Sequence, residues 1–421
     1  MRAVESTYVG TSSGPPRIPA MYLAEQSVAP TMPSAEELVQ RARELIPKLE
    51  QRWERADRER RIADETLAEM QQAGLFRVLQ PRRWGGYEMD PQVFYRIQLA
   101  LAEGCMSTAW VYGVIAVHNW QLALYDERAQ REVWGEDSST LISSSYMPKG
   151  RLQRVDGGFR LSGRWGFSSG VDHCQWAFLG ALVPDEAGRA PPEFRTFLVP
   201  RRDFTVVDAW DTIGLRATGS QDIEVSDAFV PEYRTHRAAS GADGTSPGLA
   251  VNRGALYRLP FGQIFVRAVS TSAVGALQGA LNHYVAWCSK RVAVNDGARS
   301  AEDPVAQQVA AETALALDEI KLALFRNFDH MMGELRAGRA LSLSDRIHYR
   351  VQSAAVPERC AALVNRLFYS SGAHGMYRSY PLTRFFIDIN CGRTHVANNV
   401  HKVERNYGGV MFGLQNADTF L

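Results

Sequence analysis

The sequence lacks an apolar run long enough to cross a lipid bilayer, for which about 20 consecutive residues are needed. Its longest apolar run is AWVYGVIAV, at residues 109–117. The N-terminus also lacks the continuous apolar core of a secretion signal. These two absences predict a protein that is not held in a membrane and that resides in the cytoplasm.

Charge and cysteine also lack the patterns that mark certain kinds of site. The formal net charge is +1, so we predict no basic surface of the size that nucleic-acid binding requires. The five cysteines are scattered without CxxC spacing, so we interpret them as reduced thiols and predict no metal site and no disulfide framework. No glycine-rich dinucleotide fingerprint follows a predicted strand, which argues against a built-in NAD(P)H site.

What the sequence does contain is an ordinary globular composition, with 45% apolar and 22% charged residues, and three successive hydrophobic patterns. Residues 1–34 are rich in Gly, Pro and Ser and predict a flexible arm. Residues 35–139 predict an N-terminal α-helical domain, 140–240 a middle β domain, and 241–421 a C-terminal four-helix bundle domain.

The first pattern is helical. Ser34 is a candidate N-cap because acidic residues follow it in the first turn. We expect the helix that begins there to be interrupted near Pro47, and a second helix to end at Gly74. Three further helices are predicted over residues 91–104, 106–124 and 126–134.

The second pattern alternates apolar and polar residues, which is typical of strands. RLQRVDGGFRLSGRW places two alternating stretches around Asp156-Gly157-Gly158 and predicts a β-hairpin. Short apolar strands that end at proline, and the alternating SQDIEVSDAFVP, complete the β domain. The third pattern predicts four long helices, over 262–290, 304–337, 345–371 and much of 380–414.

This order of helices, β domain and helical bundle resembles the acyl-CoA dehydrogenase fold. Three stretches are similar to segments of that family, namely GLFRVLQPRRWGGYEMD (74–90), GGFRLSGRWGFSSG (157–170) and DTIGLRATGSQDIEVSDAFVP (211–231). The resemblance covers roughly residues 35–415. It implies an α+β multidomain protein with an N-terminal helical domain, a central β-barrel or sandwich, and a C-terminal four-helix bundle.

The dehydrogenases of this fold usually place a catalytic glutamate before Gly-Thr near the C-terminus, and RFFIDINCGRTHVANNVH (384–401) contains no such glutamate. The chain is instead similar to the flavin-dependent aromatic monooxygenases of the fold, such as the 4-hydroxyphenylacetate and secosteroid-phenol hydroxylases. The stretches that match them better are TAWVYGVIAVHNWQ (108–121), ISSSYMP (142–148) and WGFSSGVDH (165–173).

That resemblance implies the oxygenase component of a two-component system. A separate NAD(P)H:flavin reductase would supply reduced flavin, either FMNH2 or FADH2. Reduced flavin and O2 would form a C4a-hydroperoxide, which would hydroxylate a small phenolic or other electron-rich aromatic substrate. The family also implies a homotetramer.

Four residues are candidate catalytic groups. His118 lies in an apolar run, where its imidazole could take the proton of a phenol in a dry site. The resemblance implies that Ser144 meets the substrate oxygen and that Ser169 forms a hydrogen bond to flavin N5. It also places His395 beside the flavin, where the imidazole could donate to the developing peroxide.

The candidate cofactor-binding residues overlap with this set, because Ser169 and His395 belong to both. Ser168 could exchange roles with its neighbour, and Trp110 could form a wall of the flavin site. The resemblance implies that Arg291 meets the flavin phosphates. Phe261-Gly262-Gln263 stands where the 4-hydroxyphenylacetate enzyme carries an arginine, and the candidates to replace it are Arg258 and Arg267.

Structural alternatives stay open for these residues. Ser168 and Ser169 also suit a plain turn at a strand end, and His118 suits a core histidine satisfied by a backbone carbonyl. Trp110 suits plain core, whereas His395 and Arg291 suit a helix surface and a solvated helix end. The alternative functions are an N- or S-oxygenating monooxygenase of the same fold, an FAD-dependent acyl-CoA dehydrogenase, and a non-catalytic member.

Overall fold

The computed structural model describes residues 32–185, 190–293, 297–418 and 421. Most of the predicted arm, residues 1–34, lies outside the described residues. Ser34–Leu421 form one compact unit, to which every statement below refers. The domain boundaries predicted inside this unit stay a prediction.

Five helices form the first part of the unit: α1 (Ala35–Glu59), α2 (Asp64–Gln72), α3 (Pro91–Gly104), α4 (Met106–Leu122) and α5 (Glu127–Trp134). The predicted N-cap is confirmed: the Ser34 hydroxyl accepts from the Glu37 N–H at 3.2 Å, and the Glu37 carboxylate accepts from the Ser34 N–H at 2.6 Å. Gly74 follows α2 in the left-handed conformation, with φ 78°, as a helix-ending glycine does.

The predicted interruption at Pro47 is wrong, because α1 runs through this residue. A proline inside a helix removes one backbone hydrogen bond. Leu45 and Leu49 are buried on either side of Pro47 in the same apolar core. Packing of the shared apolar face therefore outweighs the lost bond, as tertiary packing commonly outweighs local helix propensity.

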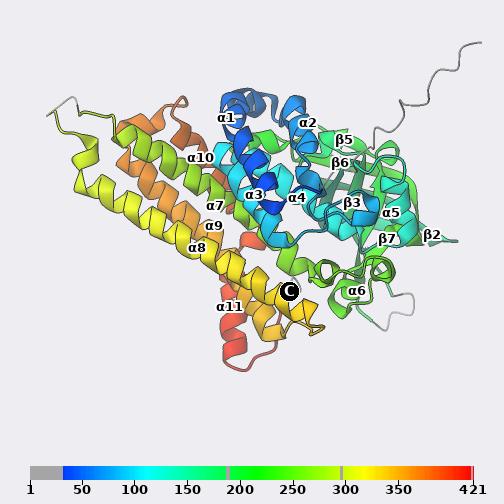
Figure 1. Ribbon diagram of the computed structural model, residues 1–421. Helices are drawn as coiled ribbons and strands as arrows, with labels where there is room; N and C mark the ends of the chain where they lie inside the picture. The colour runs from blue at the N-terminus through cyan, green and yellow to red at the C-terminus, as the bar shows by residue number, and fades with distance from the viewer. Residues whose placement is uncertain (1–31, 186–189, 294–296, 419–420) are drawn as a thin grey trace, which may run out of the picture. The chain divides into compact units, whose positions relative to one another are not determined.

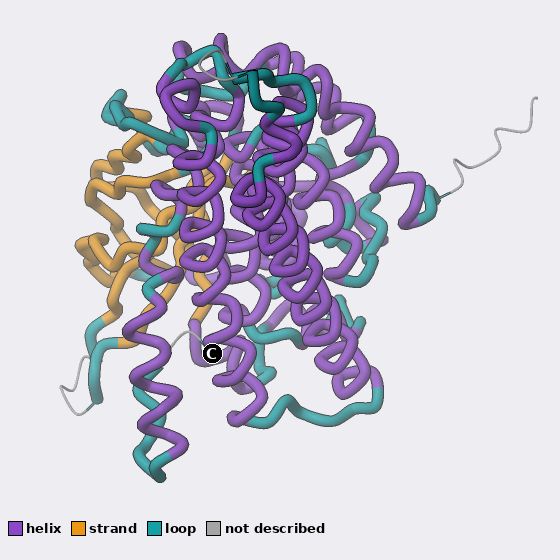
Figure 2. The backbone as a smooth tube through the Cα atoms, turned by 90° about the vertical axis from the view of Figure 1, so that its left-hand side faces the viewer, coloured by secondary structure: helices purple, strands orange, loops and turns teal. Residues whose placement is uncertain are grey.

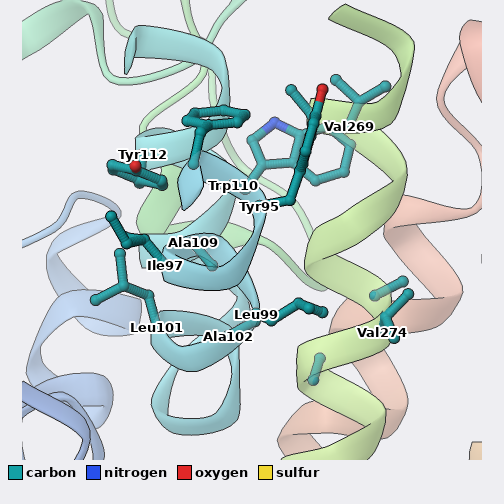
Figure 3. Close-up of a cluster of buried hydrophobic side chains, with 14 of the residues drawn as sticks. Tyr95, Ile97, Leu99, Leu101, Ala102, Ala109, Trp110, Tyr112, Val269 and Val274 are labelled. Carbon is teal, nitrogen blue, oxygen red and sulfur yellow. The ribbon is translucent and has the colours of Figure 1, made fainter. Parts of the chain in front are cut away.

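Helix α4 is buried at every position. Its neighbours include α3, α7, the first strand and the short 3-10 helices η1 (Leu75–Arg77) and η5 (Arg216–Thr218). A helix that is apolar all round is typical of the interior of a large protein. Figure 3 shows part of this core, in which Trp110 of α4 lies near Val269 of α7.

Seven strands form one sheet in the order β5-β6-β2-β1-β3-β4-β7. They are β1 (Ile142–Val155), β2 (Gly158–Ser168), β3 (Trp176–Val183), β4 (Glu193–Pro200), β5 (Thr205–Val207), β6 (Gln221–Pro231) and β7 (Thr235–Arg237). β1 and β3 run parallel, and the other neighbouring pairs run antiparallel. The predicted hairpin is confirmed, since Val155 of β1 pairs with Gly158 of β2.

The two halves of the sheet meet in β1, which pairs first with β3 and then with β2. Its register shifts between Ser145 and Gly150, where the strand changes partner. Side chains from both halves share one apolar core, in which the rings of Phe159 on β2 and Phe197 on β4 lie 5.4 Å apart. The sheet thus encloses its core as the predicted sandwich or barrel does.

The chain then forms the short α6 (Ala238–Asp243) and four packed helices, α7 (Phe261–Cys288), α8 (Pro304–Arg336), α9 (Leu343–Ser370) and α10 (Pro381–Gly392). Figure 1 shows α7, α8 and α9 side by side, and Figure 2 shows the strands gathered on one side of the long helices. By length and composition α7 could span a membrane, but nearly all of it is buried inside the protein.

The single helix predicted over much of 380–414 is wrong, because two helices occupy this range. α10 ends at Gly392, and α11 (Val400–Met411) begins after a break that contains the 3-10 turn η11 (Val396–Asn398). His395 Nδ1 accepts from the Ala397 N–H at 3.1 Å, and the Asn399 side chain accepts from the Lys402 N–H at 3.2 Å. These side chains cap the new helical turns and so stabilise the break.

A substitution at Gly170 tests how closely the chain after β2 packs against α4. Its φ is 68°, and a Cβ there would lie 2.8 Å from Ile115 Cδ1 and 2.9 Å from Val111 Cγ1 of α4. Gly170→Ala should therefore destabilise the protein by roughly 2 kcal/mol or more, from left-handed strain and overpacking together. The measurement is the urea unfolding midpoint.

Gly157→Ala is the matched control, because Gly157 has φ 73° but no heavy atom within 4 Å of the added Cβ. It should cost only the conformational strain, about 1 kcal/mol. Equal losses in the two variants would show that the contact with α4 does not matter.

Candidate active site

Helix α4 carries two polar clusters. The Trp110 cluster consists of Trp110, Ser169, Thr218, Ser220 and His395. The His118 cluster consists of His118, Gln121, Ser144, Tyr146 and Phe265. Eight residues separate Trp110 from His118, which corresponds to about 12 Å along the helix axis. The four predicted catalytic residues, His118, Ser144, Ser169 and His395, thus all belong to these two clusters.

In the Trp110 cluster, three hydroxyl groups form a chain. Trp110 Nε1 donates to Ser169 Oγ at 3.3 Å, and the Ser169 and Ser220 hydroxyl oxygens lie 2.7 Å apart. Ser220 Oγ is in turn 2.7 Å from Thr218 Oγ1, whose hydrogen goes to the Leu215 carbonyl at 2.7 Å.

The direction of this chain is fixed, because each hydroxyl has a single hydrogen. The Thr218 hydroxyl donates its hydrogen to the Leu215 carbonyl, so it can only accept from Ser220. Ser220 therefore donates to Thr218 and must accept from Ser169. Ser169 accepts one bond from Trp110, which leaves one of its lone pairs unused within the cluster. Ser169 is therefore prepared to accept a hydrogen bond from an N–H group.

The backbone holds the two ends of this chain together. The Gly170 N–H donates to the Thr218 carbonyl at 2.8 Å, which ties the end of β2 to η5. Leu215 adopts the left-handed conformation, with φ 52°, and its N–H donates to Asp388 Oδ1 of α10 at 2.6 Å. Burial raises the pKa of Asp388 to about 6. The carboxylate thus fixes a strained turn that carries Thr218.

Ser168 lies beside this chain at the end of β2. Its hydroxyl oxygen is buried and has no hydrogen-bond partner among the described residues. A buried hydroxyl without a partner is uncommon and is consistent with a missing ligand group. Its predicted cofactor role stays a prediction.

His395 closes the cluster from the break between α10 and α11. Its ring lies edge-on to Trp110, with 5.6 Å between the centroids. Since Nδ1 accepts from a backbone N–H, the ring hydrogen is on Nε2. Burial and the positive charge of Arg350 lower the pKa of His395 to about 4, so the imidazole is neutral at pH 7 and donates through Nε2.

His118 has the opposite tautomer. Its Nδ1 lies 2.6 Å from the Ile142 carbonyl oxygen, which can only accept, so Nδ1 carries the hydrogen and Nε2 has a free lone pair. Nε2 is buried and has no partner among the described residues. Burial lowers the pKa of His118 to about 4. The backbone carbonyl contact expected for a core histidine is therefore present at Nδ1. It leaves Nε2 free to act as a base.

Aromatic rings surround His118 and keep it dry. Phe178 lies edge-on at 5.5 Å between ring centroids, and Phe265 stacks at 6.5 Å. The Tyr146 ring is 6.3 Å away, and its hydroxyl donates to Gln121 Oε1. The Ser144 side chain is near enough to the same hydroxyl to lower its pKa, which places Ser144 in the His118 cluster.

The predicted arginine is not brought to either cluster. Arg291 follows the C-terminal end of α7, where it lies over the Trp287 ring at 4.7 Å and donates to Ser300 Oγ at 3.3 Å. The Asn398 side chain contacts Val269 of α7 near the Trp110 cluster. The helical rise puts Arg291 roughly 30 Å further along. Arg291 therefore does not reach the Trp110 cluster of its own chain. Of the two candidate replacements, Arg258 is exposed and Arg267 is buried.

The sequence analysis missed several members of the two clusters and the carboxylate that holds Leu215, namely Gln121, Tyr146, Thr218, Ser220, Phe265 and Asp388. A signal for two of them was present: Thr218 and Ser220 are the Thr and Ser of the 211–231 stretch that resembles the family. Gln121 follows His118 by one helical turn, so their side chains share a face of α4. Asp388 carries no local signal, because its partner, Leu215, is distant in the sequence.

The Trp110 cluster fits a flavin. The heterocyclic edge of the flavin ring carries N–H groups and carbonyl oxygens. The cluster offers the acceptor on Ser169 and the His395 Nε2–H. No group of three or more His, Cys, Asp or Glu side chains suited to a metal ion occurs among the described residues.

Comparisons with known proteins show the family to which the chain belongs. Residues 32–138 match the model of the acyl-CoA dehydrogenase N-terminal domain, and residues 268–400 match that of the C-terminal domain. The chain is 39% identical over 384 residues to the flavin-dependent monooxygenase oxygenase subunit HsaA of Rhodococcus jostii, covering 91% of this chain and 100% of that protein.

A second relative and a solved structure are similar to the chain over most of its length. The chain is 33% identical to the FADH2-dependent resorcinol hydroxylase, oxygenase component, of a Rhizobium species, covering 85% of this chain and 89% of that protein. The crystal structure of 3-HSA hydroxylase from Rhodococcus sp. RHA1 superposes with a TM-score of 0.88 at 39% identity, covering 91% of this chain and 99% of that chain. The chain belongs to the flavin-dependent monooxygenase oxygenase components that are built on the acyl-CoA dehydrogenase fold.

Proposed function

We propose that this protein hydroxylates a phenolic substrate with O2 and reduced flavin, which a separate reductase supplies. Two relatives support the phenol, because the resorcinol hydroxylase and the 3-HSA hydroxylase carry hydroxylase names, and resorcinol is itself a phenol. The observation that carries the proposal is the tautomer of His118, whose buried, unpartnered Nε2 is a ready acceptor for a phenolic O–H.

A base is needed because the hydroxyl group of a phenol is weakly acidic. With a pKa near 10, roughly a thousandth of a phenol is ionised at pH 7, and closing that gap takes about 4 kcal/mol. An electrophilic oxygen reacts faster with the electron-rich phenolate. Nε2 of His118 accepts the phenolic hydrogen as the electrophilic oxygen attacks the ring, because the O–H group becomes far more acidic at that stage. The Nδ1–H stays on the Ile142 carbonyl and holds the imidazole in place. Ser144, in the same cluster, orients the substrate oxygen.

Reduced flavin, once bound, would supply the two electrons that activate O2, and one atom of that O2 would be transferred to the substrate. The Trp110 cluster would hold its ring: Ser169 accepts from a ring N–H, and His395 donates through Nε2. The surrounding aromatic and aliphatic side chains exclude water. We propose FMNH2 or FADH2 as the reduced flavin, and the name of the Rhizobium relative includes FADH2.

We also propose that the protein is a homotetramer in the cytoplasm. Helix α8 exposes Leu315 and Leu322, which lie seven residues apart and therefore on one face, and Phe412 is exposed beyond α11. Exposed apolar side chains on long helices are suited to burial between subunits. Light scattering on a sizing column would give the mass of the assembly.

One prediction concerns His118 as the base. His118→Asn can keep a donor on the Ile142 carbonyl but cannot take a proton, so hydroxylation should fall by roughly a hundredfold or more at pH 7. The wild-type rate should be flat between about pH 5 and pH 8, because a histidine with a lowered pKa stays neutral there. The variant's rate should instead rise about tenfold per pH unit, with the phenolate fraction. Single-turnover mixing of reduced enzyme with O2 and a phenol measures both rates.

The pH profile also separates the alternatives. An N- or S-oxygenating enzyme needs no phenolate, so the variant would keep both the wild-type rate and its flat profile. A flat profile in His118→Asn with a phenol as substrate would remove the base role. The Glu-dependent dehydrogenase reaction would instead be seen as flavin reduction by an acyl-CoA.

The second prediction concerns Ser169. Ser169→Ala removes the acceptor in the Trp110 cluster and should lower the product formed per O2 several-fold, with the difference released as hydrogen peroxide. This follows from the contribution of one hydrogen bond, on the order of 1 kcal/mol. Product and peroxide are measured in the same reaction. Ser168→Ala is the control and should keep the wild-type ratio. If Ser168→Ala lowered the ratio and Ser169→Ala did not, Ser168 would be the hydrogen-bond acceptor for the flavin.

A further inference from the structure

Two arginines face each other inside the helical bundle. Helices α7 and α9 lie side by side (Figure 1), and two hydrogen bonds between them have the same residue offset: Gln263 Nε2 to the Arg346 carbonyl at 3.0 Å, and Ser270 Oγ to Ser353 Oγ at 3.1 Å. A constant offset means that the helices run parallel in fixed register. In both hydrogen bonds the residue on α9 is numbered 83 higher than its partner on α7. Arg350 and Arg267 differ by the same number and lie between the two bonded pairs, so they occupy facing turns.

Both guanidinium groups are removed from water. Arg267 is 4% exposed and Arg350 is 3% exposed. Nη2 of Arg267 and both Nε and Nη1 of Arg350 are buried without a hydrogen-bond partner among the described residues. Burial of an arginine with unused donors is costly unless an acceptor fills the place.

The charges around the pair do not balance. Arg350 Nε lies 3.5 Å from Asp418 Oδ2, on the segment that follows α11. No acidic side chain pairs with Arg267 among the described residues. Burial and the charge of Arg350 lower the pKa of Arg267 to about 10, so the group still carries its proton at pH 7. Among the described residues, two buried cations therefore share one carboxylate, and one positive charge is uncompensated.

The groups nearest to Arg267 do not supply an anion. The Tyr95 hydroxyl donates to the Ile264 carbonyl at 2.6 Å, and burial raises its pKa, so it stays neutral. Figure 3 shows Tyr95 beside α7, on the side where Val269 lies. The charge of Arg267 thus has no partner on α3 or α7.

The arginine pair adjoins the Trp110 cluster. The turn η11, which begins after His395, packs against both α7 and α9. Arg350 is close enough to lower the pKa of His395. In the same region Asn398 donates to the Val269 carbonyl at 3.3 Å, while its Oδ1 is buried without a partner. An anionic group on a molecule bound beside His395 is thus close to the uncompensated charge.

We propose that Arg267 and Arg350 form an anion-binding subsite next to the Trp110 cluster, which takes a carboxylate or phosphate group of a molecule bound there. Guanidinium groups bind both oxyanions by paired, charge-assisted hydrogen bonds. The anion site itself follows from the charge balance. Whether the substrate or the flavin carries the anion rests on the proposed function.

The first experiment tests the site without any turnover. Thermal unfolding of the ligand-free wild type is compared in sodium phosphate and in sodium chloride of equal ionic strength. Phosphate should raise the wild-type midpoint, because a ligand that binds the native state stabilises it. Arg267→Met should lose this shift and should melt at or above the wild-type midpoint in chloride, since it removes an unpaired buried charge.

Arg350→Met is the matched control. It removes the cation that lies 3.5 Å from the buried Asp418 carboxylate, so it should melt below the wild type in both salts. Arg267→Lys, which keeps the charge, should keep part of the phosphate shift. A phosphate shift that persists in Arg267→Met, or a wild type without any shift, would overturn the subsite.

The second experiment identifies the source of the anion by equilibrium binding. One pair of probes is FMN and riboflavin, and the other is 4-hydroxyphenylacetate and 4-methylphenol. Arg267→Met should weaken the charged member of one pair by about tenfold, as expected for loss of a charge-assisted bond, and leave its neutral partner unchanged. Loss for FMN assigns a flavin phosphate, and loss for 4-hydroxyphenylacetate assigns a substrate carboxylate.

Equal effects on the charged and neutral members of both pairs would contradict the subsite. The two proposals fail separately, because these measurements need no hydroxylation. A protein that binds phosphate through Arg267 but oxidises no phenol would keep the subsite and lose the proposed function.

Discussion

Trp110 and His118 are fixed relative to each other because both lie on α4, a helix buried on every side. A helix in that position cannot rotate or shift without disturbing α3, α7, β1 and η5 together. The separation between the two clusters is therefore set by the helical rise rather than by loops. A site for a flavin ring and a site for its substrate need this kind of fixed spacing, because oxygen transfer depends on the distance between them.

The two histidines reach opposite hydrogen-bonding roles through their backbone partners. His118 meets a carbonyl and so presents a free nitrogen lone pair, whereas His395 meets an N–H and so presents a hydrogen. Burial keeps both rings neutral, since it lowers both pKa values to about 4. In the same way, the Leu215 carbonyl sets the direction of the whole hydroxyl chain, which leaves Ser169 as an acceptor.

Elsewhere the bundle holds polar groups that local structure does not require. The hydroxyl of Ser168, Nε2 of His118 and Nη2 of Arg267 are all buried without partners in the described part of the chain. Each unpaired group costs stability in the ligand-free protein. A ligand that pairs with such a group stabilises the native state.

The sequence by itself determined the elements whose signals are local. The Ser34 cap, the Gly157 turn and the helices α3, α4 and α5 follow from caps, turn residues and periodicity, and the family motifs indicated Ser169, His118 and His395. Tertiary structure decided the rest. Packing on both sides of Pro47 kept α1 whole, caps at His395 and Asn399 divided one expected helix into two, and the length of α7 carried Arg291 away from the site. The tautomers, the direction of the hydroxyl chain and the facing arginines depend on contacts between residues far apart in the chain, which no local pattern encodes.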